Sequence, residues 1–278
     1  MKLVFIADYF VEQILGGGEL NNEQVIDILK SRGYEVKKIN SHLVDEAFIE
    51  DNKEHYYIVA NFVNLSENCK NLLLDKKYII YEHDHKYLRV RNPGLFQDFI
   101  APKEQLINIS FYRNAQSVLC QSQFHLDIIR KNINLDNLVN LSGNLWDTES
   151  LEFMRTVSQK EKRNLCSIMS SNIEHKNTTE AIMYCQAKNL EYALISDNNY
   201  YRFLEKLGAN KKFVFFPKTP ETLSRVVVEA RMMNMQVIVN KMIGATREPW
   251  FSLKGEELID LMIEKRDNIT DTIIHLLR

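Results

Sequence analysis

Two glutamates in the segment FFPKTPETLSRVVVEARMMNMQVIVN (215–240) have a spacing that suits ligand chemistry. Glu221 precedes Glu229 by eight positions, in a stretch whose pattern predicts a strand, a loop, a helix over 222–233 and another strand. Each carboxylate offers two acceptor oxygens, which suit the paired hydroxyl groups of a ribose or a sugar ring. The alternative is an i,i+4 surface pair between Arg225 and Glu229, worth only about 0.2–0.5 kcal/mol.

The same pattern places Thr222, Leu223 and Ser224 in the first turn of the predicted helix. The first N–H groups of a helix have no partner within it, and the positive end of the helix dipole lies there. The sequence therefore predicts an anion site at these three residues.

Three further segments carry residues that suit binding. Lys176 lies in the loop SSNIEHKNTTEA (170–181) as a compact cation for phosphate oxygens, or as an ordinary solvated lysine. The run 16–19, Gly-Gly-Gly-Glu, lets the backbone approach a ligand closely, although a flexible turn explains it equally well. In YEHDH (81–85), His83 and His85 are expected on one side of an extended segment. No further metal ligands are identifiable by spacing, so no metal is predicted.

The elements around these loops alternate regularly. Strands are predicted at 3–7, 34–39, 56–61, 77–84, 117–122, 164–171, 192–196, 212–216 and 236–240, with helices between most of them. Apolar strands separated by helices predict parallel sheets covered on both faces. The fold class is therefore α/β, with one domain over 1–145, a second over 146–254 and a helical tail of one or two helices over 255–278.

The segment with the two glutamates resembles the donor-binding segment of retaining glycosyltransferases of the GT-B fold, especially glycosyltransferase family 4. The family pattern E-x-F-G-x-x-x-x-E-A is matched at Glu221, Glu229 and Ala230. Leu223 stands at the phenylalanine position and Ser224 at the glycine position. The resemblance implies two facing Rossmann-like domains with a cleft between them, and a nucleotide-sugar donor held by the second domain.

The resemblance also implies roles for individual residues. In the second domain these are Glu229 on the ribose, Glu221 on the sugar ring, and Lys176, Thr222, Leu223 and Ser224 at the donor diphosphate. Ser171 and Asn172 occupy the region where the family supplies an arginine, and Asn172 is expected to contact the donor there. Arg247, Arg89 or Arg91 is expected to supply the second cation for the phosphate or to contact the acceptor. In the first domain, the run Gly16-Gly17-Gly18-Glu19 resembles a G-G-x-E loop whose amides face the donor, with Gly17 and Gly18 as the expected donor contacts. His83 matches a histidine that contacts the sugar, supported by Asp84, and these two residues and Glu221 are the expected catalytic residues.

Composition bounds the function further. The 278 residues are 45% hydrophobic and 26% charged, with a formal net charge of -2, which disfavours a nucleic-acid partner. The four cysteines are far apart, which indicates a reducing compartment. The N-terminal apolar run is too short for a signal peptide, and no run has the length of a membrane span. We therefore expect a cytoplasmic protein.

The expected function is that of a hexosyl- or pentosyltransferase, acting with retention and without a tightly bound cofactor. The donor is expected to be a UDP- or GDP-sugar, and the acceptor a saccharide or glycan. One alternative is a viral-type enzyme that glycosylates a base in DNA, to which the basic segment 86–91 would contribute. Another is a non-catalytic nucleotide-sugar binding protein, because a fold does not fix a function.

Overall fold

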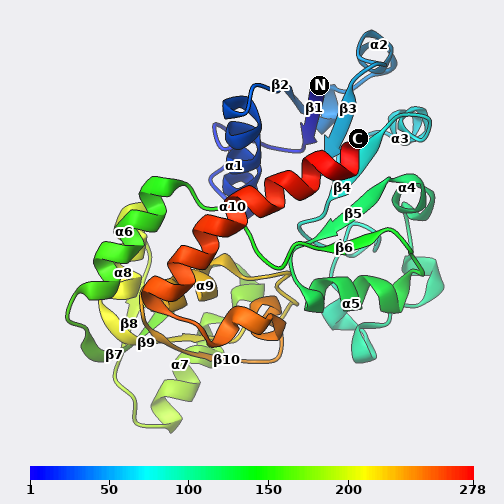
Figure 1. Cartoon of the computed structure of the whole chain (residues 1–278). Coiled ribbons are helices and arrows are strands. Elements are labelled where there is room, and N and C mark those ends of the chain that lie inside the picture. Colours follow the sequence, from blue (N-terminus) through cyan, green and yellow to red (C-terminus); the bar gives the residue numbers. More distant parts are fainter. The chain divides into compact units, whose positions relative to one another are not determined.

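The computed structural model describes all residues from Met1 to Arg278, which form two compact α/β units. The first unit consists of Met1–Leu145 together with Lys265–Arg278, and the second of Trp146–Glu264. Figure 1 shows the elements of both units along the chain. No helix combines the length and the apolar character that crossing a membrane requires.

The first unit contains a six-stranded parallel sheet. Its strands are β1 (Lys2–Ala7), β2 (Glu35–Asn40), β3 (Tyr56–Val59), β4 (Tyr78–Tyr81), β5 (Ser117–Cys120) and β6 (Leu138–Asn140), in the spatial order β2-β1-β3-β4-β5-β6. Its helices are α1 (Gly17–Ser31), α2 (Glu46–Asp51), α3 (Glu67–Leu73), α4 (Ile109–Asn114) and α5 (Gln123–Asn132). Short 3-10 helices lie at Ser41–Leu43, Pro93–Leu95, Gln97–Phe99 and Lys103–Gln105.

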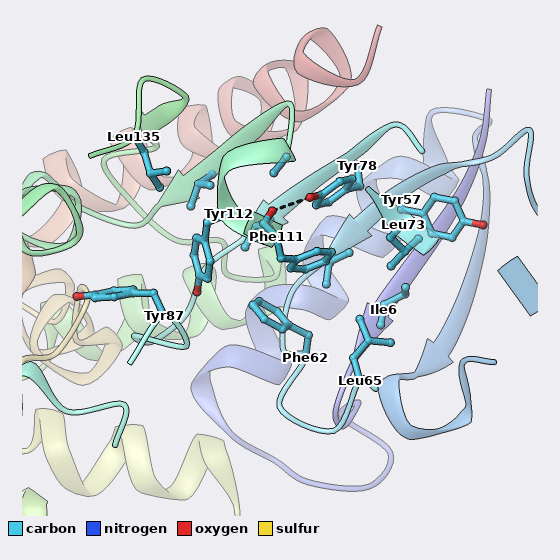
Figure 2. Packing of buried hydrophobic residues seen from close by; sticks show 14 of the residues in the cluster. Ile6, Tyr57, Phe62, Leu65, Leu73, Tyr78, Tyr87, Phe111, Tyr112 and Leu135 are labelled. Carbon is cyan, nitrogen blue, oxygen red and sulfur yellow. Dashed lines mark hydrogen bonds between the residues drawn. The ribbon is translucent and has the colours of Figure 1, made fainter. Parts of the chain in front are cut away.

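Alternate side chains of these strands enter two separate cores, because successive residues of a strand point to opposite faces. In β1, Val4 and Ile6 join the core beneath α2 to α5, whereas Leu3 and Phe5 join the core beneath α1. Figure 2 shows the first of these cores, which is rich in aromatic rings. The hydroxyl group of Tyr78 donates a 2.6 Å hydrogen bond to the carbonyl oxygen of Phe111 there, so a buried phenol keeps a partner.

The C-terminal helix α10 (Gly255–Leu277) is one continuous helix, and its last part belongs to the first unit. This part lies alongside α1 (Figure 1) and contributes Ile269 and Ile273 to the core on that face. The guanidinium of Arg32 just after α1 donates hydrogen bonds of 2.6 Å to both Asp267 and Asp271 of α10. The final helical segment therefore completes one face of the first sheet.

The second unit contains a four-stranded parallel sheet. Its strands are β7 (Arg163–Met169), β8 (Tyr192–Ile195), β9 (Asn210–Phe215) and β10 (Gln236–Val239), in the order β10-β9-β7-β8. Its helices are α6 (Thr148–Gln159), α7 (Thr178–Ala187), α8 (Tyr200–Gly208), α9 (Arg225–Met232) and the first part of α10. Short 3-10 helices lie at Glu174–Lys176, Gly244–Arg247 and Pro249–Ser252.

This sheet also separates two cores. Phe213 and Phe215 of β9 pack with α6, α8, α9 and the start of α10, whereas Val214 packs beneath α7. The four cysteines of the chain are free and buried, two of them (Cys166 and Cys185) in the core beneath α7. The parallel order brings the loops after β7 and β9 to one edge of the sheet, because neighbouring parallel strands end on the same side.

Candidate functional site

Lys176 and Glu221 lie on these two loops and contact one another. Lys176 ends the 3-10 helix after β7, and Glu221 follows β9. The ammonium of Lys176 donates a 2.8 Å hydrogen bond to Oε1 of Glu221, and both side chains remain partly exposed, at 25% and 17%. An ion pair as exposed as this contributes about 0–1 kcal/mol to stability. Its location at the carboxyl edge of a parallel sheet, where α/β proteins bind ligands, is more informative than its energy.

The segment from Glu221 to Ser224 is not helical, since Glu221 forms a bridge with Ile243 and Thr222 and Leu223 lie in a bend. The prediction that Thr222, Leu223 and Ser224 form the first turn of a helix was therefore wrong. The N–H of Glu221 donates to Met242 O at 2.8 Å, and Ala245 donates from its N–H to Leu223 O at 2.9 Å. This pairing with a distant segment holds the chain away from helical geometry. Helix α9 begins at Arg225 instead.

Ser224 caps this helix in the left-handed region, with φ 76°. A residue with a side chain there costs about 1–3 kcal/mol relative to glycine, which explains why the family pattern has glycine at the position. The Ser224 hydroxyl is buried without a hydrogen-bond partner. The side chain of Leu223 is fully buried in the core of the second unit, so only the backbone of this residue could contact a ligand.

Glu229 lies on α9 and is buried, with 3% of its surface exposed. Its Oε1 accepts a 2.9 Å hydrogen bond from the indole N–H of Trp146 and a 2.7 Å bond from the hydroxyl of Tyr200. The guanidinium of Arg225 lies 3.6 Å from the same oxygen and stacks over the Trp146 ring at 4.4 Å. The i,i+4 pair therefore exists, but it is buried between aromatic rings and is not a surface pair.

The remaining candidates of the second unit are exposed. Asn172 and Arg247 both lie at the surface, Asn172 on the loop after β7 and Arg247 at the end of a 3-10 helix. Ser171 accepts a hydrogen bond from the N–H of Ile173, which shapes the loop ahead of Lys176. The second unit thus brings Lys176 and Glu221 together and places Glu229 in a separate aromatic cluster.

In the first unit, the glycine run and His83 come together. Gly17 and Gly18 open α1, and a Cβ atom added to Gly18 would lie 3.7 Å from Cγ of His83. Nε2 of His83 lies 2.6 Å from Oδ1 of Asn22, while Nδ1 contacts the side-chain amide of Gln121. An amide oxygen can only accept, so Nε2 carries the proton in a neutral His83. His85 has other partners, Tyr87 and His125.

A buried ionic cluster follows β4. We call Glu82, Asp84, Lys86 and Tyr112 the Glu82 network. The Lys86 ammonium donates to Glu82 and, at 2.8 Å, to Asp84, and the Tyr112 hydroxyl donates to Glu82. Glu82 is 0% and Lys86 2% exposed, so both charges are shielded from water.

The charged groups of the Glu82 network shift one another's pKa values. Burial raises the pKa of the Glu82 carboxyl to about 7, although Lys86 acts to lower it. Burial opposes the charge of Lys86, but Asp84 and Glu82 outweigh it and raise the pKa of the ammonium. For Asp84, burial is outweighed by Lys86 and Arg91, which hold the pKa of that carboxyl below its usual range. Asp84 is therefore a charged residue fixed in place directly beside His83.

His125 packs beside this network as a neutral ring. Its Nδ1 accepts from the N–H of Gln121 at 3.3 Å, and its Nε2 donates to the carbonyl oxygen of Asp84 at 2.9 Å. Burial lowers the pKa of His125 to about 4, and Lys86 lowers it further, whereas the hydrogen bond to Asp84 acts in the opposite direction. Both ring nitrogens are used by the neutral form, so protonation must break the bond at Nδ1.

We expect His125 to lower the stability of the first unit as the pH falls from 6.5 towards 4, against an opposite contribution from Glu82, whose raised pKa makes the folded chain take up a proton in the same range. The unfolded chain binds a proton on His125 near pH 6.5, whereas the folded chain resists it down to about pH 4. The free energy of unfolding should therefore fall by about 2 kcal/mol between pH 7 and pH 5 from His125. Amide hydrogen exchange in β4 and β5 measures this. Between pH 7 and pH 5, His125→Gln should lack this contribution of about 2 kcal/mol, and the exposed control His275→Gln should keep it. The same change of stability with pH in all three proteins would contradict the prediction.

Arg89 and Arg91 lie on the exposed segment after the Glu82 network. The guanidinium of Arg91 reaches Asp84 at 3.3 Å, so it is tied to the His83 loop. Both arginines line a cavity of the first unit together with Lys86. No group of three or more His, Cys, Asp or Glu side chains lies close enough together to hold a metal ion.

No protein-family model and no curated protein sequence matches the chain. Solved structures do match over nearly its whole length. HepE of Anabaena in complex with UDP and glucose is 14% identical, covers 98% of this chain and 90% of its own, and has a TM-score of 0.57. The catalytic domain of starch synthase IV from Arabidopsis thaliana, bound to ADP and acarbose, is 9% identical, with coverage of 99% and 94% and a TM-score of 0.59.

These neighbours and the two parallel sheets decide the fold. The chain has the GT-B fold. An alpha-glucosyltransferase in complex with UDP-glucose and DNA containing an abasic site also shares it, at 12% identity, with coverage of 99% and 91% and a TM-score of 0.51. The expected α/β class with helix-flanked parallel sheets is thus confirmed.

The roles of several residues in the two units were not predicted from the sequence. Trp146 and Tyr200 hold Glu229, and Glu82 and Lys86 form the core of the network beside His83. The i,i+4 spacing of Glu82 and Lys86 was a signal, since such pairs meet on a helix. Here they meet in a loop after β4, which the spacing did not indicate.

Proposed function

We propose that this GT-B chain is a glycosyltransferase that takes a sugar from a nucleotide-sugar donor bound by its second unit. The observation that carries the proposal is the 2.8 Å contact between Lys176 and Glu221. The two residues lie 45 positions apart, on neighbouring loops at the carboxyl edge of the sheet. The glycosyltransferase activity of the neighbours with this fold, which were crystallised with UDP, UDP-glucose or ADP, supports the same assignment.

Lys176 is the proposed partner of the donor diphosphate, and Glu221 that of the sugar hydroxyls. An ammonium of unit charge offers three donors to phosphate oxygens. Its stabilisation of the departing nucleoside diphosphate is the main catalytic contribution, because negative charge develops there as the glycosidic bond breaks. Glu221 holds the lysine in position before the donor arrives and accepts hydroxyl hydrogen bonds when the donor is bound.

Glu229 is the proposed ribose ligand. Trp146 and Tyr200 both donate to its Oε1, which orients the carboxylate, and a ribose hydroxyl would donate to Oε2. Two aromatic donors on one oxygen fix the rotamer, so little entropy is lost when the ribose binds. In the GT-B resemblance this glutamate closes the E-x7-E pair.

In the first unit, His83 is the proposed contact of the donor sugar, with Asp84 in support. The charged Asp84 directly follows His83, whose Nε2 lies 2.6 Å from Oδ1 of Asn22. Gly17 and Gly18 present the start of α1, a 15-residue helix whose first N–H groups suit an anionic group. We further propose a UDP- or GDP-sugar as donor, transfer with retention of configuration, and a saccharide or glycan as acceptor.

A donor panel tests the proposal. We expect one of UDP-, GDP-, ADP- and CMP-glucose to raise the melting temperature, because a ligand at 100 times its Kd stabilises by about 2.7 kcal/mol. Slow hydrolysis of the same donor should accompany binding. Glu229→Gln keeps an acceptor for Trp146 and Tyr200 but lowers the charge, and should weaken binding about 10-fold. The exposed control Glu191→Gln should bind normally. Absence of binding by all four donors refutes the proposal.

A non-catalytic nucleotide-sugar binding protein is the second candidate. Its support is the loop ahead of Lys176, where Ser171 and the exposed Asn172 stand in place of the arginine of the family pattern. A binding protein would be stabilised by one donor without hydrolysing it or transferring the sugar. Turnover of the stabilising donor therefore separates the two candidates.

A further inference from the structure

A cavity of about 530 Å³ opens in the first unit beside the carboxyl ends of β3 and β4. Phe62 and Leu88, both fully buried, form apolar parts of its wall, and Figure 2 shows the Phe62 ring among the aromatic side chains of the core. Small-molecule sites usually measure about 300–1,000 Å³. The cavity therefore has the size of a site for a sugar or a comparable small molecule.

Four cationic side chains line this cavity: Lys70, Lys86, Arg89 and Arg91. Lys86 forms ion pairs with Glu82 and Asp84, and Arg91 forms one with Asp84. Lys70 contacts Glu67 at 2.6 Å, but the Glu67 side chain is 78% exposed, so that contact is screened by water. The cations outnumber the carboxylates that contact them by one, which leaves the cavity positive.

Arg89 is the cation without a counterion. Its guanidinium forms no hydrogen bond or ion pair, although the backbone that carries it is fixed. The N–H of Arg89 donates to Gln105 O at 2.9 Å, and Ile107 donates to Tyr87 O at the same distance. The side chain of Asn108 joins the two lysines, since it accepts from Lys70 Nζ at 2.9 Å and donates to Lys86 O at 2.8 Å. Hydrogen bonds within the protein therefore hold the cavity wall in place without a ligand.

We infer that this cavity binds the phosphate group of a phosphorylated sugar or polyol, which serves as the acceptor of the transfer. The role of this ligand as the acceptor rests on the proposed function, whereas the phosphate site itself is inferred from the geometry of the first unit alone. The planar guanidinium of Arg89 offers paired N–H donors that match phosphate oxygens. The side chain of Val63, which also lines the cavity and is 48% exposed, offers an apolar surface to the carbon face of a sugar ring.

A small phosphorylated molecule fits these observations better than duplex DNA. Specific DNA interfaces bury about 1,000–2,500 Å² of protein surface and are strongly positive, whereas this feature is a single concave site. The formal net charge of the chain is -2, which does not favour a polyanion. The phosphate can come from a free sugar phosphate or from a lipid-linked one, because both present the same group to Arg89.

Calorimetry on the full-length protein tests the inference, with inorganic phosphate, glucose 6-phosphate and glucose as probes. We expect glucose 6-phosphate to bind more tightly than glucose, and phosphate to compete with it. Arg89→Gln should weaken glucose 6-phosphate binding about 10-fold or more, the value of a charge-assisted hydrogen bond. Arg113→Gln removes an exposed arginine of α4 outside the cavity and should bind like the unsubstituted protein. Vesicles carrying a polyprenyl phosphate then distinguish the lipid-linked source from the free one.

Equal binding by the unsubstituted protein and Arg89→Gln, or no preference for glucose 6-phosphate over glucose, overturns the inference. Competition of a DNA duplex with glucose 6-phosphate, lost in Arg89→Gln, overturns it in favour of a DNA acceptor. Donor binding is measured separately on the unsubstituted protein. Donor binding without phosphate binding refutes this site alone. Phosphate binding that depends on Arg89, without binding of any donor, refutes the proposed function and leaves the site.

Discussion

Replacing Lys86 with methionine should destabilise the first unit by about 3–5 kcal/mol, because a buried ion pair that loses one partner leaves the other charge uncompensated. Lys86 is 2% exposed and contacts both Glu82 and Asp84. Methionine has nearly the same length, so packing changes little and the loss reports the charge. Amide hydrogen exchange in β3, β4 and β5 measures the effect in the unit concerned.

A second substitution distinguishes the effect of the Glu82–Lys86 ion pair from the effect of the packing of the lysine side chain. Glu82→Gln combined with Lys86→Met removes both charges, and buried ion pairs replaced on both sides are often neutral in stability. The double variant should therefore recover most of the loss. The fluorescence of Trp146 and Trp250, both in the second unit, serves as the control signal for that unit. A double variant no more stable than Lys86→Met would show that the lysine acts through its packing alone.

The loss in Lys86→Met should also depend on pH. Burial raises the pKa of Glu82 to about 7 even with the lysine present, and removing the lysine raises it further. The folded state of the variant then takes up a proton on Glu82 that the unfolded state releases above about pH 4.5. The difference from the unsubstituted protein should therefore shrink as the pH falls towards 7, where only the variant takes up the proton. It should change little between pH 7 and pH 5, because both proteins take up the Glu82 proton there and the His125 effect is common to both.

The strands and most helices could be predicted because their signals are local. Apolar runs such as 3–7 and 212–216 are buried on both faces, and each became a central strand, β1 and β9. The start of α9 could not be predicted in this way. It depends on pairing of Glu221 and Leu223 with residues about twenty positions further along the chain, and on a left-handed Ser224. A helical pattern over 222–233 carries no sign of either.

The candidate site likewise has features that local signals predict and features that depend on the tertiary structure. The spacing of Glu221 and Glu229 indicated carboxylates near a helix start, and the resemblance to GT-B enzymes supplied Lys176. The environment of Glu229 depends on Trp146, 83 positions away, and no local pattern could indicate that bond. Burial of a carboxylate depends on the tertiary structure, because hydrogen-bond donors from other elements must replace the water that solvates it in the unfolded chain.

Replacing Lys176 with alanine should lower kcat for transfer or donor hydrolysis about 100- to 1,000-fold, the range for loss of one group that stabilises developing charge. The ammonium is partly exposed and its pair with Glu221 contributes little to folding, so the variant should melt close to the unsubstituted protein. Lys218→Ala is the matched control. Lys218 lies on the loop after β9 and pairs with Glu174 at the surface, so its removal should leave the rate unchanged.

A cycle with Glu221→Gln shows whether the two residues act together. If Glu221 positions the lysine and binds the sugar, each single variant should lose activity, and the double variant should lose less than the product of the two effects. Multiplicative effects would assign them to separate steps. A Lys176→Ala variant that keeps its rate, with donor binding intact, would show the contact to be only a surface ion pair and would move the diphosphate-binding role to another cation of the chain.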